Sequence, residues 1–168
     1  MANGKNSAQN DMTVSLDDVI EHMDLQSEEL TAYINRKTGE LVALTHEEVA
    51  LAEDPEEAAE AAEWQKELLP KAREVLESGD FIPLPSKFEI HEWSIMERFA
   101  GSVVDPRMAD EIDRALHGRG AFRRFKDVVA RSGLVDEWYR FRDAALEEIA
   151  TEFLEANKIA YRRESPQK

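Results

Sequence analysis

The stretch LTAYINRKTGELVAL, residues 30–44, decides the fold class, because it predicts strands in a sequence whose other segments are mostly helical. β-Branched and aromatic residues lie on both sides of Lys37-Thr38-Gly39, and Gly39 can supply the positive φ of a tight turn. We therefore expect an antiparallel hairpin with strands over residues 30–36 and 40–44.

A third strand is expected further along the chain. FIPLP, residues 81–85, combines strand-forming residues with two prolines, and a proline cannot donate a hydrogen bond to a strand ladder. We therefore place a strand over residues 81–84 at an edge of the sheet. The hairpin and this strand together predict a small antiparallel sheet of about three strands.

Capping residues and apolar periodicity predict helices over most of the remaining sequence. Pro70 is expected to kink or divide the helix in which it lies. Residues that suit N-cap positions precede most of the helices: Ser15, Thr45, Asp54, Ser86 and Asp105. The expected helices cover residues 16–25, 45–53, 55–78, 87–103, 106–117, 121–132 and 134–157.

The fold class is therefore α+β, a predominantly helical single domain over residues 13–160 with a small antiparallel sheet. Residues 1–12 lack hydrophobic periodicity and predict a disordered N-terminal tail, and residues 161–168 predict a loose C-terminal tail. Phe88 is expected to be largely buried. The residues expected to dominate the core are Trp93, Phe99, Phe122, Phe125, Trp138, Phe141, Ile149 and Phe153.

The composition of the chain limits its partners and its compartment. With 36 acidic and 21 basic residues the net charge is −15, which repels phosphate backbones and anionic membrane surfaces at long range. The absence of cysteine excludes disulfides, thiolate nucleophiles and the usual structural zinc sites. No stretch approaches the roughly 20 apolar residues of a membrane span, and the N-terminus lacks the apolar run of a signal peptide. We expect a cytoplasmic protein with no cofactor and no membrane partner.

Catalytic and metal-binding patterns are missing from the sequence. The four histidines, His22, His46, His91 and His117, are scattered, and no pair has the i, i+4 spacing of a helical metal site. There is no G-x-S-x-G motif, and the Gly-Arg-Gly of residues 118–120 follows an expected helix and lacks the Lys-Ser/Thr of a phosphate loop. We therefore lean against an enzyme and assign no catalytic residue and no metal ligand.

The acidity has one main source, residues 47–80, where 12 acids and 3 bases give a net charge of −9. Within this stretch, residues 47–63 have two interpretations. Alanine and glutamate are good helix formers, so the charges can simply cover a solvated helix face, which is the interpretation that we favour. The alternative is a docking surface for a basic protein, including mimicry of nucleic-acid charge.

GRGAFRRFKD, residues 118–127, is a cluster of bases in this acidic chain, and residues 118–131 contain five bases and one acid. In one interpretation, which we favour, the guanidinium groups pair with carboxylates such as Asp136, Asp143 or those of the acidic helix. In the other, at least two of them stay available to a phosphate or an acidic partner. The candidate patch consists of Arg119, Arg123, Arg124, Lys126 and Arg142.

Several of these stretches resemble the bacterial uncharacterised protein family 0158. The resemblance is carried by YINRKTGELV, by GRGAFRRFKD and by WYRFRD with the Leu-Glu pair that follows it, and it covers about residues 13–159. Many relatives have a second tryptophan in the last helix, where this chain has Phe153. The resemblance implies a bacterial, cytosolic protein and transfers no catalytic residue.

The sequence leads us to expect a non-enzymatic, acidic protein-interaction or regulatory module that binds a protein partner through charge, with a basic protein as one candidate partner. The alternative is binding of phosphate, a nucleotide or nucleic acid through Arg119, Arg123, Arg124 and Lys126. An enzyme comes third and would need a deep pocket lined by a carboxylate and one of these arginines. The oligomeric state stays open.

Overall fold

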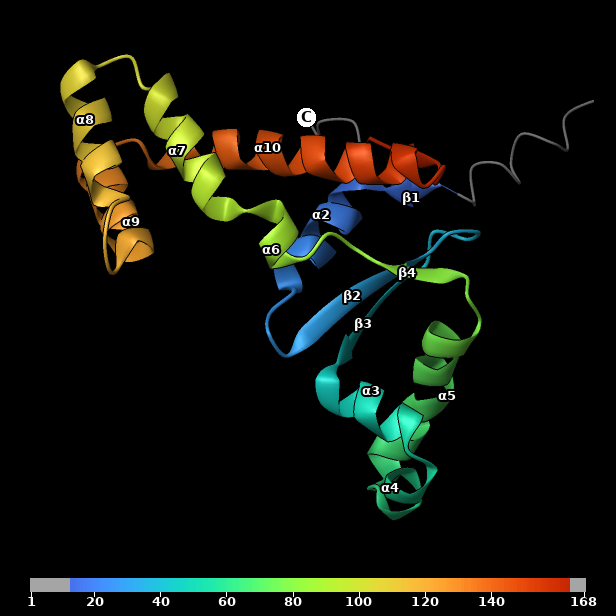
Figure 1. Cartoon of the computed structure of the whole chain (residues 1–168). Helices are drawn as coiled ribbons and strands as arrows, with labels where there is room; N and C mark the ends of the chain where they lie inside the picture. The colour runs from blue at the N-terminus through green and yellow to red at the C-terminus, as the bar shows by residue number, and fades with distance from the viewer. Residues whose placement is uncertain (1–12, 164–168) are drawn as a thin grey trace, which may run out of the picture. The chain divides into compact units, whose positions relative to one another are not determined.

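The computed structural model describes residues 13–163 and confirms a predominantly helical α+β fold with a small antiparallel sheet (Figure 1). The N-terminal elements are β1 (Val14–Ser15), α2 (Leu16–Leu25), β2 (Leu30–Asn35), β3 (Leu41–Thr45), α3 (His46–Glu53), α4 (Pro55–Glu60) and α5 (Glu63–Glu77). They are followed by β4 (Phe81–Pro83), α6 (Lys87–Ile90), α7 (Glu92–Ser102), α8 (Pro106–Ala115), α9 (Ala121–Arg131), α10 (Val135–Ala156) and β5 (Tyr161–Arg162).

The described residues group into two compact units. The first unit contains residues 13–87 and 150–163, and the second contains Phe88–Ile149, so that the boundary falls within α10. Whether the chain folds as the one domain expected over residues 13–160 stays a prediction. The predicted N-terminal tail, residues 1–12, lies outside the described residues.

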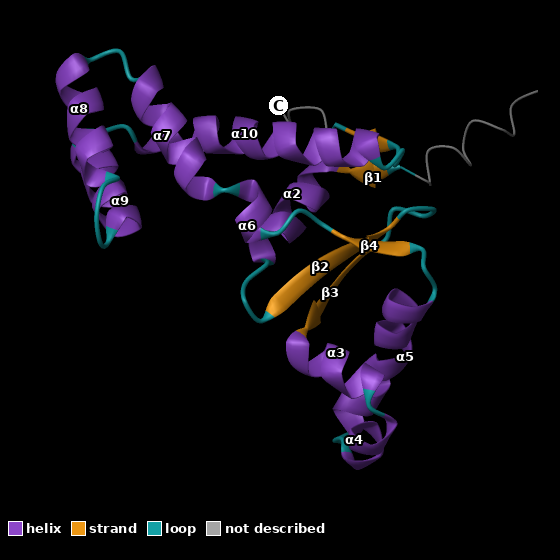
Figure 2. Ribbon diagram, viewed as in Figure 1, coloured by secondary structure: helices purple, strands orange, loops and turns teal. Residues whose placement is uncertain are grey.

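The three-stranded sheet of the first unit has the order β3-β2-β4, and both pairings are antiparallel (Figure 2). Gly39 has a φ of +79° in the β2–β3 turn, where Asn35 accepts hydrogen bonds from the Lys37 and Thr38 amides. Pro83 lies in the edge strand β4, as its missing amide hydrogen predicts. The hairpin and the third strand agree with the sequence to within a residue.

A short parallel pairing of β1 with β5 was not expected from the sequence. The Val14 amide donates to the Ala160 carbonyl at 3.2 Å, and Arg162 Nη1 donates to the Thr13 carbonyl at 2.6 Å. The prediction of a loose tail is therefore wrong for Tyr161 and Arg162, while residues 164–168 lie outside the described range. Two-residue strands are too short to show an alternation of apolar and polar residues.

One hydrophobic cluster of the first unit joins the sheet to α3, α4 and α5, mainly through small and aliphatic side chains. Its buried members are Leu44, Leu51, Ala52, Ala58, Leu69, Ala72, Val75 and Phe81. Pro70 was expected to kink or divide the long helix, but it lies inside α5, and the division falls at Ala61 and Ala62, which are extended. Gln65 stabilises the new helix start, because its Oε1 accepts the Ala62 amide at 3.0 Å.

A buried glutamine links the helical and strand segments of the first unit. Gln26 Oε1 accepts a hydrogen bond from the Ala32 amide at 3.1 Å, and Nε2 donates to the Pro85 carbonyl at 2.7 Å. Both bonds satisfy backbone groups that would otherwise be buried without a partner. The side chain therefore holds the end of α2 against β2 and the segment after β4.

The core of the second unit contains a group of aromatic rings beside its aliphatic residues. Phe99 lies edge-to-face with Phe125, Trp138 and Phe141, at ring-centroid distances of 6.2, 5.4 and 5.5 Å. Phe99, Phe125 and Trp138 are buried, as expected, and Phe141 is half-buried. Outside this group, Trp93, Ile149 and Phe153 are also half-buried rather than central.

Two phenylalanines that the sequence placed in the core are exposed. Phe88 is 86% exposed because the expected helix breaks at His91, which has a φ of +54°, and leaves Phe88 in the four-residue helix α6. Phe122 is 50% exposed because it lies in the first turn of α9, at the flank of the buried face formed by Phe125, Val128 and Val129.

The buried Phe99 and the exposed Phe88 predict a large and a small effect on stability for the same substitution to alanine. Phe99→Ala removes the shared ring of the aromatic group and is expected to lower the free energy of unfolding by about 3–5 kcal/mol. Phe88→Ala is the matched control and is expected to change it by less than about 0.5 kcal/mol. Urea denaturation followed by circular dichroism measures both, and similar losses in the two variants would contradict this description of the core.

Candidate binding surfaces

Arg124 of the candidate patch is used inside the chain, at the turn between α8 and α9. Gly118 and Gly120 have φ values of +89° and +71°, so the chain turns through two left-handed positions that favour glycine. The Arg124 Nη2 group donates to the His117 carbonyl and would lie 3.3 Å from a Cβ atom on Gly118. The Gly-Arg-Gly sequence therefore forms a turn closed by an arginine and not a phosphate loop.

Arg142 is also paired within the second unit. Its Nε atom donates to Glu92 Oε1 at 2.7 Å, and both side chains are largely shielded from solvent. This pair joins α10 to α7. Internal pairing with a carboxylate, the interpretation that we favoured for the whole patch, is therefore correct for Arg142.

The remaining three members of the patch, Arg119, Arg123 and Lys126, are exposed. Within residues 13–163 no ion pair or hydrogen bond joins their side chains to another residue, so the expected pairing is wrong for them. Arg123 and Lys126 are three residues apart on α9 and share a side of the helix, and Phe122 lies beside them at four residues from Lys126. We call Arg119, Arg123 and Lys126 the basic surface.

A surface depression of about 800 Å³ lies between α8 and α9. Its charged lining consists of Arg114, Arg124 and Arg131 with Glu111 and Asp127. Arg114 forms an ion pair with Asp110, one turn earlier on α8. Because carboxylates alternate with guanidinium groups around it, this depression does not present the uniform positive charge of an anion site.

A larger set of charges lies on the helices of the first unit. The described residues of the first unit contain 21 acids and 9 bases, whereas the second unit contains 13 acids and 10 bases. Glu63 forms an ion pair with Lys66, Glu74 forms one with Lys71, and Asp54 caps α4. Seven exposed carboxylates on α3, α4 and α5 make no ion pair within the described residues, and we call the five from Glu53 to Glu67 the acidic surface: Glu53, Glu56, Glu57, Glu60 and Glu67.

Two apolar residues beside this acidic surface were missed by the sequence analysis. Trp64 and Leu68 of α5 are 63% and 42% exposed. On the helical projection Leu68 lies between the buried positions Ala72 and Val75, and Trp64 lies close to Val75, so periodicity alone gave no signal that the two side chains are exposed.

The described residues show neither a metal site nor a membrane helix. Among residues 13–163 no group of three or more His, Asp or Glu side chains is placed to hold a metal ion. His22 and His117 each contact a backbone carbonyl one turn earlier, at 2.8 Å. Over the same residues no helix combines the length and the apolar character that crossing a bilayer requires.

Comparisons with known proteins identify no relative of this chain. No family model, no curated protein and no solved structure matches the chain. Its function has to be inferred from the basic surface, the acidic surface and the exposed side chains around them.

Proposed function

We propose that the protein is a non-enzymatic interaction module that binds a basic protein partner through the acidic surface. The observation that carries the proposal is that none of the five exposed carboxylates of the acidic surface, on α3–α5, makes an ion pair within residues 13–163. The resemblance to family 0158 adds a bacterial, cytosolic setting to the proposal.

The energetics of such a surface favour a cationic partner. Like charges on neighbouring helix positions repel one another, and the nearby lysines Lys66 and Lys71 are already paired with other carboxylates. Burial, and next the negative charge of Glu53, raise the pKa of Tyr33. A basic partner relieves the repulsion and is also steered toward the surface over long distances.

Neutralising the acidic surface tests this function. In the quadruple variant Glu56→Gln, Glu57→Gln, Glu60→Gln and Glu67→Gln, recovery of basic proteins from lysate of the native host is expected to fall at least about fivefold. The matched control neutralises four exposed acids of the second unit, Glu97, Glu111, Asp113 and Glu137. This control variant should recover the basic proteins as the wild type does. Quantitative mass spectrometry measures the recovery, and equal recovery by both variants, or no specific partner of the wild type, would contradict the proposal.

A second function, binding of phosphate, a nucleotide or nucleic acid, is favoured by the basic surface. Arg119, Arg123 and Lys126 have no carboxylate partner among the described residues, so their positive charges are available. Phe122 is exposed next to them, and stacking on single-stranded bases requires an exposed ring. The net charge of −15 opposes the approach of a phosphate backbone, which is why this function ranks second.

Anisotropy of a labelled single-stranded oligonucleotide at about 50 mM salt tests the second function. The variant Arg119→Ala, Arg123→Ala and Lys126→Ala is expected to bind at least about tenfold more weakly, with a salt dependence lower by about two counterions. Arg124 is left intact because it holds the α8–α9 turn. The control variant is Arg98→Ala with Arg107→Ala. Unchanged affinity of the triple variant, or no binding by the wild type, would contradict this second function.

A further inference from the structure

Trp64 is an exposed tryptophan whose side chain makes no hydrogen bond and no ring contact among the described residues. Of the three tryptophans in the chain, Trp93 donates from Nε1 to the Leu116 carbonyl at 3.1 Å, and Trp138 is buried against Phe99 and Phe125. Within residues 13–163 no hydrogen bond or ring contact involves the Trp64 side chain, which is 63% exposed. A large apolar side chain that the fold does not use is typical of an interface.

Leu68 extends the exposed apolar surface by one helical turn. It lies four residues after Trp64 on α5, so the two side chains are neighbours on the same side of the helix. Ala59 and Ala62, which precede Trp64, are exposed and carry only a methyl group. A partner can therefore approach the indole ring closely without displacing a long side chain.

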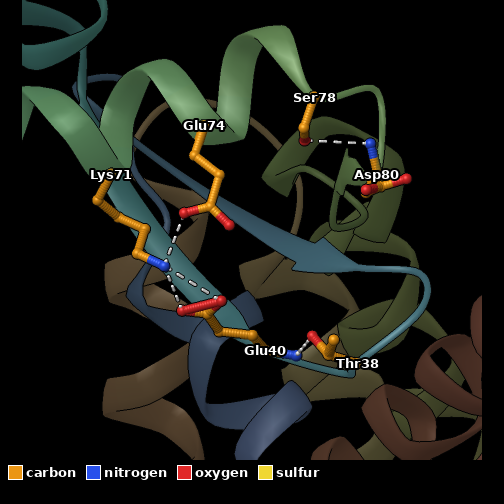
Figure 3. Close-up of polar contacts among 6 residues, drawn as sticks. All are labelled: Thr38, Glu40, Lys71, Glu74, Ser78 and Asp80. Atoms are coloured by element: carbon orange, nitrogen blue, oxygen red, sulfur yellow. Dashed lines mark hydrogen bonds and ion pairs between the residues drawn. The ribbon is translucent and has the colours of Figure 1, made fainter.

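Most of the charges around these two residues are negative, and Lys66, which lies between them in the sequence, forms an ion pair with Glu63. Glu60, Glu63 and Glu67 are all exposed and lie within four residues of Trp64. Lys71, one turn beyond Leu68, is held at 2.8 Å by Glu40 and at 3.0 Å by Glu74 (Figure 3). Hydrogen bonds to Glu40 and Glu74 raise the pKa of Lys71, and these carboxylates offset its positive charge. An apolar centre with an acidic rim complements a partner with an apolar centre and a basic rim.

We propose that Trp64 and Leu68 form the apolar anchor of a docking site whose occupant is a basic amphipathic helix of a partner protein. The i, i+4 spacing of the two side chains matches the spacing at which a helix presents its own apolar residues, so that the two ridges can interdigitate. This inference rests on the proposed function and adds where the partner binds and what its binding segment is.

Two other occupants fit the surface less well. A second copy of this chain would bring the same carboxylates face to face in a two-fold contact, which charge repulsion opposes. The segments of this chain outside the structure are not basic: residues 1–12 contain one lysine and one aspartate, and residues 164–168 contain one glutamate and one lysine. Charge complementarity therefore favours a separate basic partner.

The test uses a fluorescein-labelled, 18-residue Lys/Leu peptide designed as an amphipathic helix, with binding to the full chain followed by anisotropy. The variant Trp64→Ala with Leu68→Ala is expected to bind at least about tenfold more weakly than the wild type. Phe88→Ala with Tyr139→Ala is the matched control, because it removes two exposed aromatic rings from the second unit, and it should bind as the wild type does. A peptide of the same composition with its apolar face disrupted should also bind at least about tenfold more weakly.

The outcomes separate this inference from the proposed function. If the quadruple glutamine variant binds the peptide weakly and the Trp64/Leu68 variant binds it normally, the docking site is wrong and the charge-based function stands. If the Trp64/Leu68 variant binds weakly and the quadruple variant normally, the basic character of the occupant is wrong. No binding by the wild type, equal binding of the disrupted peptide, or a Trp64-dependent dimer in analytical ultracentrifugation would each overturn the inference.

Discussion

The free-energy cost of burying a carboxylate is the constraint on which the rest of this structure depends. The chain has 36 acids and 21 bases, and an unpaired carboxylate cannot be buried at an acceptable free energy. The buried polar residues of the described chain are all uncharged: Ser15, Gln26 and Asn35. The acids therefore occupy the outer sides of helices whose inner sides carry alanine, leucine and valine. Such helices bury little apolar surface each, and α3, α4 and α5 need the sheet to complete their core.

The bases are divided between pairing within the fold and exposure to solvent. Lys37, Lys66, Lys71 and Lys87 form ion pairs in the first unit, and Arg142 forms a shielded one in the second. None of these pairs involves the five carboxylates of the acidic surface, and none involves Arg119, Arg123 or Lys126. The described residues thus include charges of both signs that make no ion pair, among them the acidic surface of the first unit and the basic surface of the second. The acidic surface carries the stronger hypothesis because the net charge of −15 favours the approach of a basic partner and opposes that of a phosphate backbone.

The sequence predicted what local chemistry determines. Gly39 and the prolines of residues 81–85 have backbone requirements that only a turn and a sheet edge satisfy, so the three strands could be located. The break at His91 could not be predicted, because a left-handed histidine has no local signal. Because the sequence analysis expected one helix over residues 87–103, it placed Phe88 in the core. In the candidate patch the limit is different, because Arg119, Arg124 and Arg142 are the same residue type. Only tertiary contacts show that Arg119 faces solvent, that Arg124 closes a turn and that Arg142 pairs with Glu92.

The central claim, that α4 and α5 bind a basic helix, is tested most directly by mapping backbone amide chemical shifts while the Lys/Leu peptide is added. The account predicts that the perturbed amides cluster in residues 55–71 and that the perturbations weaken near 1 M salt, where charges are screened beyond about 3 Å. Perturbations centred on residues 119–126, or spread evenly over all exposed acids without regard to Trp64, would contradict it.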